Sequence, residues 1–240
     1  MPKRRYLAAF LMGMMLAVSP HPAHAAPALP GVGASDARSI VNPDTPPWSA
    51  LGRVQTALGG RCTGFLIAPN VVETAAHCLY LPKTGRYIQP GDVHFLRAYS
   101  RGRYAAHARV GRFLVPPGYD PRNEATTAAY DRATLFLDAP VADKQQTLEV
   151  AQALPEPETP VAIGGYEQDY QEILIRDQNC HVTAIVSDQA GRPMIAHDCA
   201  ATRGSSGAPV LTRQGDHWVA LGIQALANPG RGGVAAPLSQ

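Results

Sequence analysis

The chain has 240 residues, of which 45% are hydrophobic and 17% charged, a globular composition with room for one large or two small domains. Lysine and arginine number 21 against 19 aspartates and glutamates, so the charge balance excludes the strongly basic class of nucleic-acid-binding proteins. Aromatic residues make up 7%, and glycine and proline number 22 each, which favours many turns and short strands over long helices.

Residues 1–25 are typical of a secretory signal peptide. Basic residues 3–5 precede a mostly apolar run over 6–18, and residues 23–25 (Ala-His-Ala) form a small-x-small cleavage site. A membrane anchor is the alternative, but the run is about 13 residues long and a spanning helix needs about 20. Cleavage leaves 18 basic residues against 19 acidic ones. We expect a secreted or periplasmic bacterial protein that binds neither nucleic acid nor, after cleavage, the membrane.

Short strand-like segments separated by turn residues fill the rest of the chain, and helix-length amphipathic runs are scarce. This pattern predicts a β barrel or sandwich. Residues 139–160 contain four prolines and several acids and are interpreted as a linker between two halves. We therefore expect a flexible N-terminus or short propeptide, a first barrel and a second barrel, over residues 26–39, 40–150 and 151–240. The predicted strands are 52–58, 62–68, 71–74, 93–99, 105–113, 133–137, 160–166, 172–175, 179–187, 193–198, 208–212, 218–226 and 233–236.

Four cysteines remain, and an even count in an exported chain favours disulfides, with three connectivities open. We expect the local pairs Cys62–Cys78 and Cys180–Cys199, because each pair falls within one half of the chain. A metal site is the competing interpretation, since two of the cysteines have a histidine beside them. Adjacent residues rarely point at one ion, and no Cys-x-x-Cys or His-x-x-x-His spacing occurs, so no metal is expected.

Residues 204–209 read Gly-Ser-Ser-Gly-Ala-Pro and predict a turn that presents one side chain. Glycine permits a positive φ and close approach of another segment, and proline prevents continuation as a helix. A serine hydroxyl there is rigid, exposed and surrounded by peptide N–H groups, as a nucleophile with an oxyanion hole requires. The alternative is an ordinary Ser/Gly turn.

A serine nucleophile needs a base to accept its proton and an acid to orient that base. The base candidate is His77, which follows Thr-Ala-Ala and precedes a cysteine. The acid candidate is Asp131, at the start of the apolar strand 133–137. Its competitors are Asp120, in a proline-rich turn, and Asp138, just before the linker.

These motifs resemble those of the chymotrypsin/trypsin-like serine peptidases, and they occur in that family's order. Residues 74–78 (Thr-Ala-Ala-His-Cys) resemble its histidine motif, and 131–137 (Asp-x-Ala-x-Leu-x-Leu) its aspartate motif. Residues 204–210 resemble its Gly-Asp-Ser-Gly-Gly-Pro-Val. The likeness covers about residues 40–236 and is greatest for the bacterial exported branch similar to glutamyl endopeptidases. It implies an all-β fold of two perpendicular six-stranded antiparallel barrels, with the active site in the cleft between them.

The resemblance also implies roles for individual residues. Ser206 would be the nucleophile, His77 the general base and then acid, and Asp131 the group that holds the imidazole tautomer. The backbone N–H groups of Gly204 and Ser206 would form the oxyanion hole, and Cys62–Cys78 would be the family's histidine-loop disulfide. The implied function is hydrolysis of protein or peptide substrates through an acyl-enzyme, by an exported monomer that needs no cofactor.

The chain departs from the family pattern at several positions. Ser205 stands where animal trypsin-like enzymes carry an aspartate that pairs with the N-terminal amine after zymogen cleavage, so that activation switch is in doubt. The peptide bond between Arg38 and Ser39 is a candidate processing point. Ala208 replaces a glycine and should be tolerated. Glu73 replaces an apolar residue, and we expect it at the surface because a buried carboxylate is costly.

By the same resemblance, Ala200, Gln224 and Gly233 would line the substrate pocket. Ala200, at the base, supplies no carboxylate, which disfavours a strict preference for Arg or Lys. Gln224 aligns with a histidine of the glutamyl-specific relatives, which disfavours a strict preference for Glu. Ala227 replaces a glycine of one wall, and Gly233 lines the other. We expect an uncharged, small-to-medium P1 residue, the residue on the acyl side of the cleaved bond.

Two other functions compete with the peptidase. A catalytically inactive trypsin-like relative would act as a binding protein, and only a labelling experiment separates it from an enzyme. An esterase of the α/β-hydrolase fold needs a Gly-x-Ser-x-Gly elbow and the order Ser, Asp, His, and this chain has neither.

Overall fold

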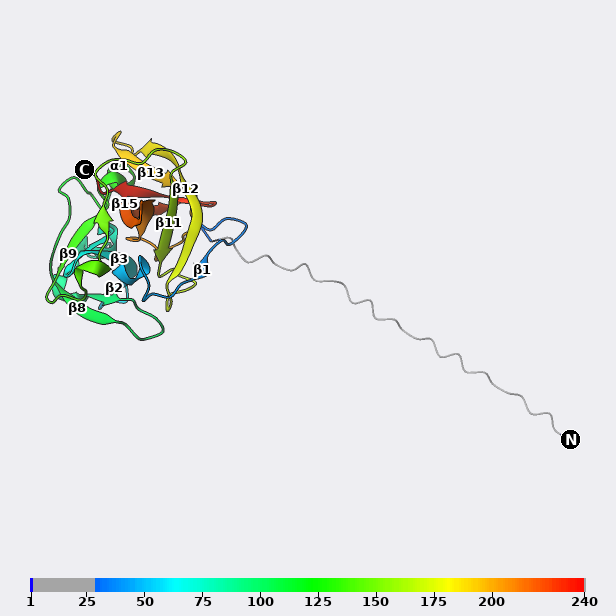
Figure 1. Cartoon of the computed structure of the whole chain (residues 1–240), viewed down its shortest axis with the longest axis horizontal. Coiled ribbons are helices and arrows are strands. Elements are labelled where there is room, and N and C mark those ends of the chain that lie inside the picture. Colours follow the sequence, from blue (N-terminus) through cyan, green and yellow to red (C-terminus); the bar gives the residue numbers. More distant parts are fainter. Residues whose placement is uncertain (2–28, 240) are drawn as a thin grey trace.

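The computed structural model describes Met1 and residues 29–239, so the predicted signal peptide beyond Met1 lies outside the described residues. Nearly all regular structure in the described part is strand (Figure 1). The strands are β1 Ser39–Ile40, β2 Leu51–Thr56, β3 Arg61–Ala68, β4 Val71–Thr74, β5 Tyr80–Leu81, β6 Arg86–Tyr87, β7 Val93–Arg97, β8 Ala106–Leu114, β9 Ala133–Leu137, β10 Glu149–Val150, β11 Pro160–Gly165, β12 Ile175–Ser187, β13 Pro193–His197, β14 Pro209–Gln214, β15 His217–Ala227 and β16 Gly233–Pro237. The helices are α1 Glu124–Thr127 and five single 3₁₀ turns, η1 Trp48–Ala50, η2 Ala76–Leu79, η3 Pro90–Asp92, η4 Ala128–Tyr130 and η5 Lys144–Gln146.

Six antiparallel strands form the first barrel, which closes in the order β2-β3-β4-β9-β8-β7. In β7 and β9 alternate residues are fully buried, as expected of strands with one face toward a core. That core is largely aliphatic, with Val54, Leu66, Val72 and Leu135 among its members, and it also contains the aromatic side chains of Phe95 and Tyr119. The low aromatic content of the sequence is thus matched by a core in which aliphatic side chains predominate.

The second barrel consists of β12-β11-β14-β15-β16-β13, and the pairing of β12 with β13 closes it. All six of these pairings are antiparallel, so the predicted pair of six-stranded antiparallel barrels is confirmed. The predicted strands 172–175 and 179–187 differ from the structure, in which one long strand, β12, begins at Ile175. Two short strands outside the ring also pair with this barrel: β1 with β12, and β10 in parallel with β15.

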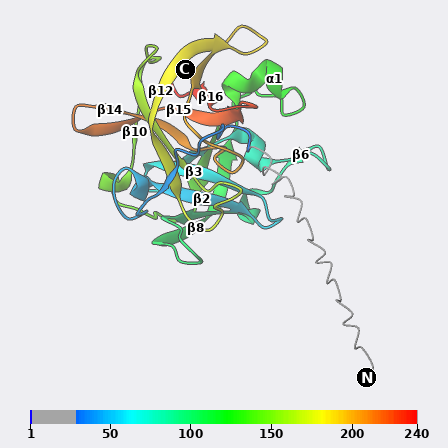
Figure 2. The same cartoon turned by 90° about the vertical axis from the view of Figure 1, so that its right-hand side faces the viewer.

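A third apolar cluster joins the two barrels, which lie side by side in both views (Figures 1 and 2). It combines Leu51 and Phe65 from the first barrel with Ala162, Leu211 and Ile223 from the second. Burying such side chains contributes about 1.5–3 kcal/mol each, so this cluster fixes the position of one barrel against the other. The barrel contact therefore sets the geometry of any site that draws residues from both halves.

Part of the N-terminal segment 26–39, which we expected to be flexible or a short propeptide, contacts the second barrel through Gly31 and Val32, whereas residues 34–37 are exposed. The Gly31 N–H donates to the carbonyls of Asn228 and Gly230, and its carbonyl accepts from the N–H groups of Ala201 and Gly232. The Val32 side chain is buried. The segment thus satisfies peptide groups of the loops around Ala201 that would otherwise need water or other partners. Among the described residues, no helix is long and apolar enough to cross a bilayer.

Candidate active site

His77 and Asp131 form a tightly coupled pair in the first barrel. His77 lies in η2, directly after β4, and its backbone N–H donates to Asp131 Oδ1 at 2.9 Å. Its ring Nδ1 lies 2.6 Å from Asp131 Oδ2. Because an ionised carboxylate only accepts hydrogen bonds, this contact places the ring proton on Nδ1 and leaves the Nε2 lone pair free. The two contacts fix both the tautomer and the orientation of the imidazole.

The electrostatics of this pair favour a basic imidazole. Burial opposes the charged form of His77, but the hydrogen bond and charge of Asp131, with a smaller contribution from Glu124, outweigh it and raise the pKa above its usual value. Asp131 is 3% exposed, whereas the His77 side chain keeps 26% of its surface accessible. The competing acids do not contact His77: Asp120 and Asp138 accept from the backbone N–H groups of Arg122 and Arg109.

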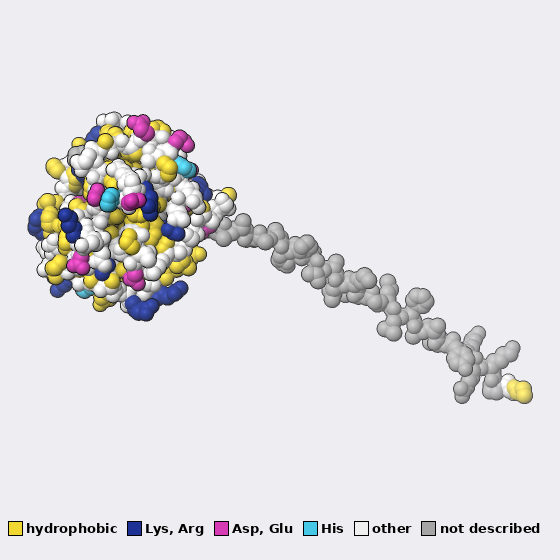
Figure 3. Space-filling model, viewed as in Figure 1, with side chains coloured by type: hydrophobic (Ala, Val, Ile, Leu, Met, Phe, Trp, Pro, Cys, Tyr) yellow, Lys and Arg dark blue, Asp and Glu magenta, His cyan; other side chains and the backbone are white. Residues whose placement is uncertain are grey.

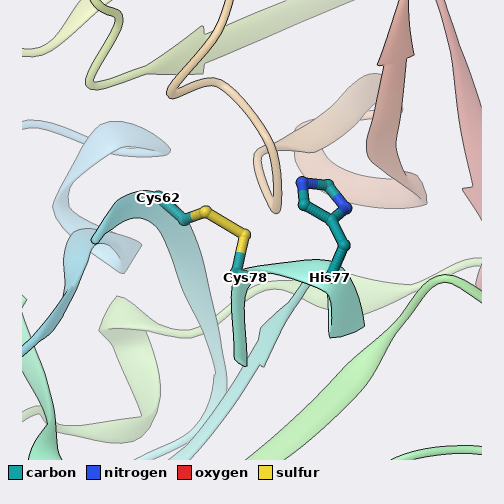
Figure 4. Close-up of side chains that lie close together, drawn as sticks. All are labelled: Cys62, His77 and Cys78. Atoms are coloured by element: carbon teal, nitrogen blue, oxygen red, sulfur yellow. A yellow bond between two sulfur atoms is a disulfide. The ribbon is translucent and has the colours of Figure 1, made fainter. Parts of the chain in front are cut away.

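Disulfides brace both halves of the site, and both predicted pairings are confirmed. Cys62–Cys78 ties β3 to the turn that carries His77, and Cys180–Cys199 ties β12 to the segment before Ala200. Figure 4 shows the imidazole of His77 beside the first of these bonds. The three side chains are close enough to surround an ion, but the two sulfur atoms are bonded to each other and are not thiolate ligands.

The turn that carries Ser206 depends on two glycines. Gly204 and Gly207 have φ values of 94° and 85°, in the left-handed region. A Cβ on Gly207 would lie 2.1 Å from the Thr63 carbonyl oxygen, and one on Gly204 would lie 2.3 Å from the Tyr166 carbonyl oxygen. Both positions therefore require glycine for conformation and for space.

Thr63 of the first barrel holds this turn at two points. Its N–H donates to the Ser206 carbonyl at 2.9 Å, and its hydroxyl donates to the Gly204 carbonyl at 2.9 Å. The same hydroxyl oxygen accepts the Tyr166 N–H at 3.0 Å. The turn of the second barrel is thus bonded directly to a strand of the first.

Among the described residues, the peptide N–H groups of Gly204 and Ser206 have no acceptor, and the N–H of the preceding residue, Arg203, has none either. The Arg203 carbonyl accepts the Gln168 N–H at 2.7 Å, and since C=O and N–H of a trans peptide point in opposite directions, the Gly204 N–H points away from Gln168. The neighbouring N–H groups of Ser205 and Gly207 are bonded to the Thr202 and Gln224 carbonyls. A pair of free donors flanking an accessible serine is the arrangement that an oxyanion hole needs.

Ser205 is buried and neutral, and its hydroxyl donates to the Thr202 carbonyl at 2.5 Å. It has no ionic partner, as expected for a residue without a carboxylate.

Beside the same turn a cleft of about 310 Å³ opens, and its lining includes Arg61, Gln168, Arg203 and Gly204. Acidic and basic side chains are interspersed on the face seen in Figure 3.

The predicted pocket residues are all buried, and two of them are in contact. A Cβ on Gly233 would lie 2.5 Å from Gln224 Nε2. Both polar atoms of the Gln224 amide are hydrogen-bonded: Oε1 lies 2.6 Å from His197 Nε2, and Nε2 donates to the Leu226 carbonyl at 3.0 Å. Burial lowers the pKa of His197, and its Nδ1 accepts the Cys199 N–H, so this histidine is neutral.

Ala200 is anchored by an ion pair that the sequence did not reveal. Its N–H donates to Asp177 Oδ2 at 2.9 Å, and the same oxygen contacts Arg231 Nη2 at 2.9 Å. Asp177, Arg231 and His197 are widely separated along the chain and match no short motif. Their only sequence signal is chemical type, which is too common to single them out.

The prediction that Glu73 lies at the surface was wrong. Its side chain is 6% exposed, and one carboxyl oxygen accepts the Thr134 hydroxyl at 2.7 Å. Burial raises the pKa of this carboxyl to about 7, against the lowering effects of the Thr134 bond and Arg132. A cavity beside Glu73 is lined by residues 114–117, Arg132 and Thr134, and the Glu73 side chain itself is shielded from solvent.

Comparisons with known proteins agree with this architecture. A family model described as Trypsin matches residues 38–240. A glutamyl endopeptidase of Bacillus licheniformis is 26% identical over 110 residues, which are 46% of this chain and 33% of that protein. The aligned part thus spans about a third of that relative's length. A solved structure of a Glu endopeptidase in complex with MPD aligns with a TM-score of 0.71 and 23% identity, covering 87% of this chain and 94% of that one.

Proposed function

The chain belongs to the trypsin family, and on that premise we propose that it is an exported serine endopeptidase with His77, Asp131 and Ser206 as its catalytic triad. The observation that carries this proposal is the double contact of one Asp131 carboxylate with the ring and the backbone N–H of His77. Such a pair supplies a base of fixed tautomer, which an inert surface histidine does not need.

Ser206 Oγ would attack the scissile carbonyl carbon while His77 Nε2 accepts its proton. The negative charge that develops on the carbonyl oxygen would be met by the N–H groups of Gly204 and Ser206, and Asp131 would stabilise the imidazolium. Collapse of the tetrahedral intermediate would break the C–N bond, with the His77 proton passing to the leaving amine. A water molecule, deprotonated by His77, would then hydrolyse the acyl-enzyme and regenerate the Ser206 hydroxyl.

The substrates would be proteins or peptides with an uncharged P1 side chain. The relatives above are named for glutamate, but a P1 carboxylate would need a cation or free donors. In this chain the Gln224 amide is bonded to His197 and Leu226, His197 is neutral, and the Arg231 guanidinium is bonded to Asp177 and the Asp198 carbonyl. Cleavage of a peptide library varied at P1 tests this, and a dominant Glu, Arg or Lys preference would refute it.

A fluorophosphonate probe tests the proposal as a whole. The processed wild-type protein should be labelled, and Ser206→Ala should not be, while Ser205→Ala, one residue away, should retain labelling. Absence of labelling in a folded wild-type protein would favour the catalytically inactive relative instead. Sequencing the N-terminus of the exported protein would test removal of residues 1–25 and locate any further processing.

A further inference from the structure

Arg38 has a charged side chain that is almost completely buried. It lies in the N-terminal segment just before β1, and its side chain is 2% exposed. Its guanidinium contacts three carboxylates: Glu167 Oε2 at 2.5 Å, Asp169 Oδ2 at 2.7 Å and Asp36 Oδ2 at 2.8 Å. The guanidinium carbon of Arg38 also lies over the Tyr170 ring, 5.6 Å from the ring centroid. These contacts distinguish Arg38 from a solvent-exposed arginine in a flexible terminal segment.

Glu167 connects Arg38 to the turn that carries Ser206. Its side chain is 2% exposed, and Oε2 accepts the Thr202 N–H at 2.9 Å in addition to the Arg38 contact. Arg38 is the only cation bonded to Glu167 among residues 29–239. Burial raises the pKa of this carboxyl to about 7, although the charge of Arg38 and the Thr202 bond lower it. Without Arg38, the ionised carboxylate would be buried without a counter-charge.

Thr202 and Arg203 set the direction of the free donors in the turn. The Thr202 carbonyl accepts both the N–H and the hydroxyl of Ser205. The Arg203 carbonyl accepts the Gln168 N–H, and Gln168 Nε2 contacts the Thr202 hydroxyl at 3.1 Å. Since Gln168 follows Glu167 directly, displacement of Glu167 would release both contacts and free the Gly204 peptide to rotate.

We propose that Arg38 is a positioning residue, which acts through Glu167 to hold the 202–206 turn with its Gly204 and Ser206 N–H groups directed at the substrate. It follows that the active enzyme retains Arg38, and that cleavage between Arg38 and Ser39 would inactivate rather than activate it. This inference rests on the proposed peptidase function, but its structural half, ordering of the turn by Arg38, is measurable without catalysis.

The test compares Arg38→Ala with the double variant Arg38→Ala/Glu167→Gln and with Arg86→Ala, a control on the exposed strand β6. Removal of Arg38 should lower kcat for a peptide substrate by at least about tenfold with a smaller change in KM, because the loss concerns transition-state donors. In the double variant, kcat should return to within about threefold of the wild-type value, because a glutamine carbonyl still accepts the Thr202 N–H and needs no cation. The kcat and KM of Arg86→Ala should equal those of the wild type.

The pH profile separates positioning from general stabilisation. The groups around Glu167 are Arg38 and Asp169, and Asp36 faces Arg38 from the other side. With Arg38 removed, a protonated Glu167 can stay buried, whereas an ionised Glu167 would move and disturb the turn. The loss of kcat relative to wild type should therefore grow as pH rises from 6 to 9. The double variant should show no such growth, since it has no ionisable group at position 167.

Hydrogen exchange across residues 199–208 gives the readout that does not depend on activity. Protection there should fall in Arg38→Ala and return in the double variant, while the first barrel stays unchanged. If Arg38→Ala does not fold, Arg38→Lys, which keeps the charge but not the forked donors, is measured in the same way. Wild-type kcat and exchange in a folded Arg38 variant, or a fully active form that begins at Ser39 without residues 29–38, would overturn the inference. Failure of wild type to react with a fluorophosphonate would refute the peptidase function instead.

Discussion

The two halves of the candidate site are held by different means. In the first barrel, His77 is fixed by one carboxylate and by a disulfide at the adjacent residue. In the second barrel, the Ser206 turn is held by Thr63 of the first barrel and by the adjacent residues Glu167 and Gln168. The proposed base is thus oriented by one carboxylate, whereas the proposed nucleophile and the Gly204 and Ser206 N–H groups depend on several hydrogen bonds from residues distant in the sequence, one of them to the Glu167 carboxylate. Single substitutions should therefore lower activity most at the His77–Asp131 pair, and by smaller, varying amounts among the contacts that hold the Ser206 turn.

The largest effect on activity is expected for Asp131→Asn. An amide can donate to Nδ1 and so favours the wrong tautomer of His77, which should lower kcat by about 10⁴-fold while the fold is retained. Steady-state kinetics on a peptide ester, with a thermal melt for folding, provide the measurement. Asp138→Asn is the matched control, since Asp138 bonds only the Arg109 backbone, and it should keep near wild-type kcat. Equal losses in the two variants would refute the pairing.

Gly207→Ala should come next. Its Cβ would collide with the Thr63 carbonyl oxygen, so the turn must move, and we expect roughly a 10²-fold loss of kcat through displaced oxyanion donors. Gly215→Ala is an unusually close control, because Gly215 also has a positive φ, of 60°, but has no atom within 4 Å of the added Cβ. It should show backbone strain alone, as a small drop in Tm. A similar kcat for both variants would mean that the turn tolerates displacement.

Thr63→Val should have an intermediate effect. It removes the hydroxyl bonds to Gly204 and Tyr166 but keeps the backbone bond to Ser206, so a loss of about 1–2 kcal/mol, or roughly tenfold in kcat, is expected. Thr212→Val removes a comparable hydroxyl bond, to the Pro160 carbonyl, and should change stability without changing kcat. A greater loss of kcat in Thr212→Val would contradict the graded bracing of the turn.

Glu73→Gln should have the smallest effect on activity and appear mainly in stability. The folded-state pKa of about 7 lies above the ordinary value of 4.5, so Glu73 costs stability progressively as pH rises from about 4.5 to 7. Urea unfolding at pH 5 and pH 8 should show that the variant gains about 2 kcal/mol relative to wild type over this interval. A variant whose relative stability does not change with pH would mean that Glu73 titrates normally.

Short-range sequence patterns predicted much of the fold, including most strands and both disulfides. Alternation and turn residues located most strands, and the two local cysteine pairs were predicted from their spacing alone. His77, Asp131 and Ser206 could be grouped only through their resemblance to a family, because 54 residues separate the first two and no local rule connects them.

The features that escaped prediction depend on what covers a residue in three dimensions. Glu73 is buried beside a cavity lined by residues 114–117 and Arg132, an environment that strand alternation does not reveal. Arg38 lies 129 residues from Glu167, and each is an ordinary charged residue in the sequence. Buried ion pairs of this kind have no compositional signature, since their partners are brought together only by the completed barrels.

The bond from the Thr63 N–H to the Ser206 carbonyl has a mechanical consequence. It crosses from one barrel to the other at Ser206, the proposed nucleophile, so a sliding or hinge movement between the barrels would displace this residue. Core substitutions at the barrel contact, such as Leu211→Ala, should therefore lower turnover at temperatures where both barrels are still intact. The reaction rate would then report how tightly the two barrels are packed against each other.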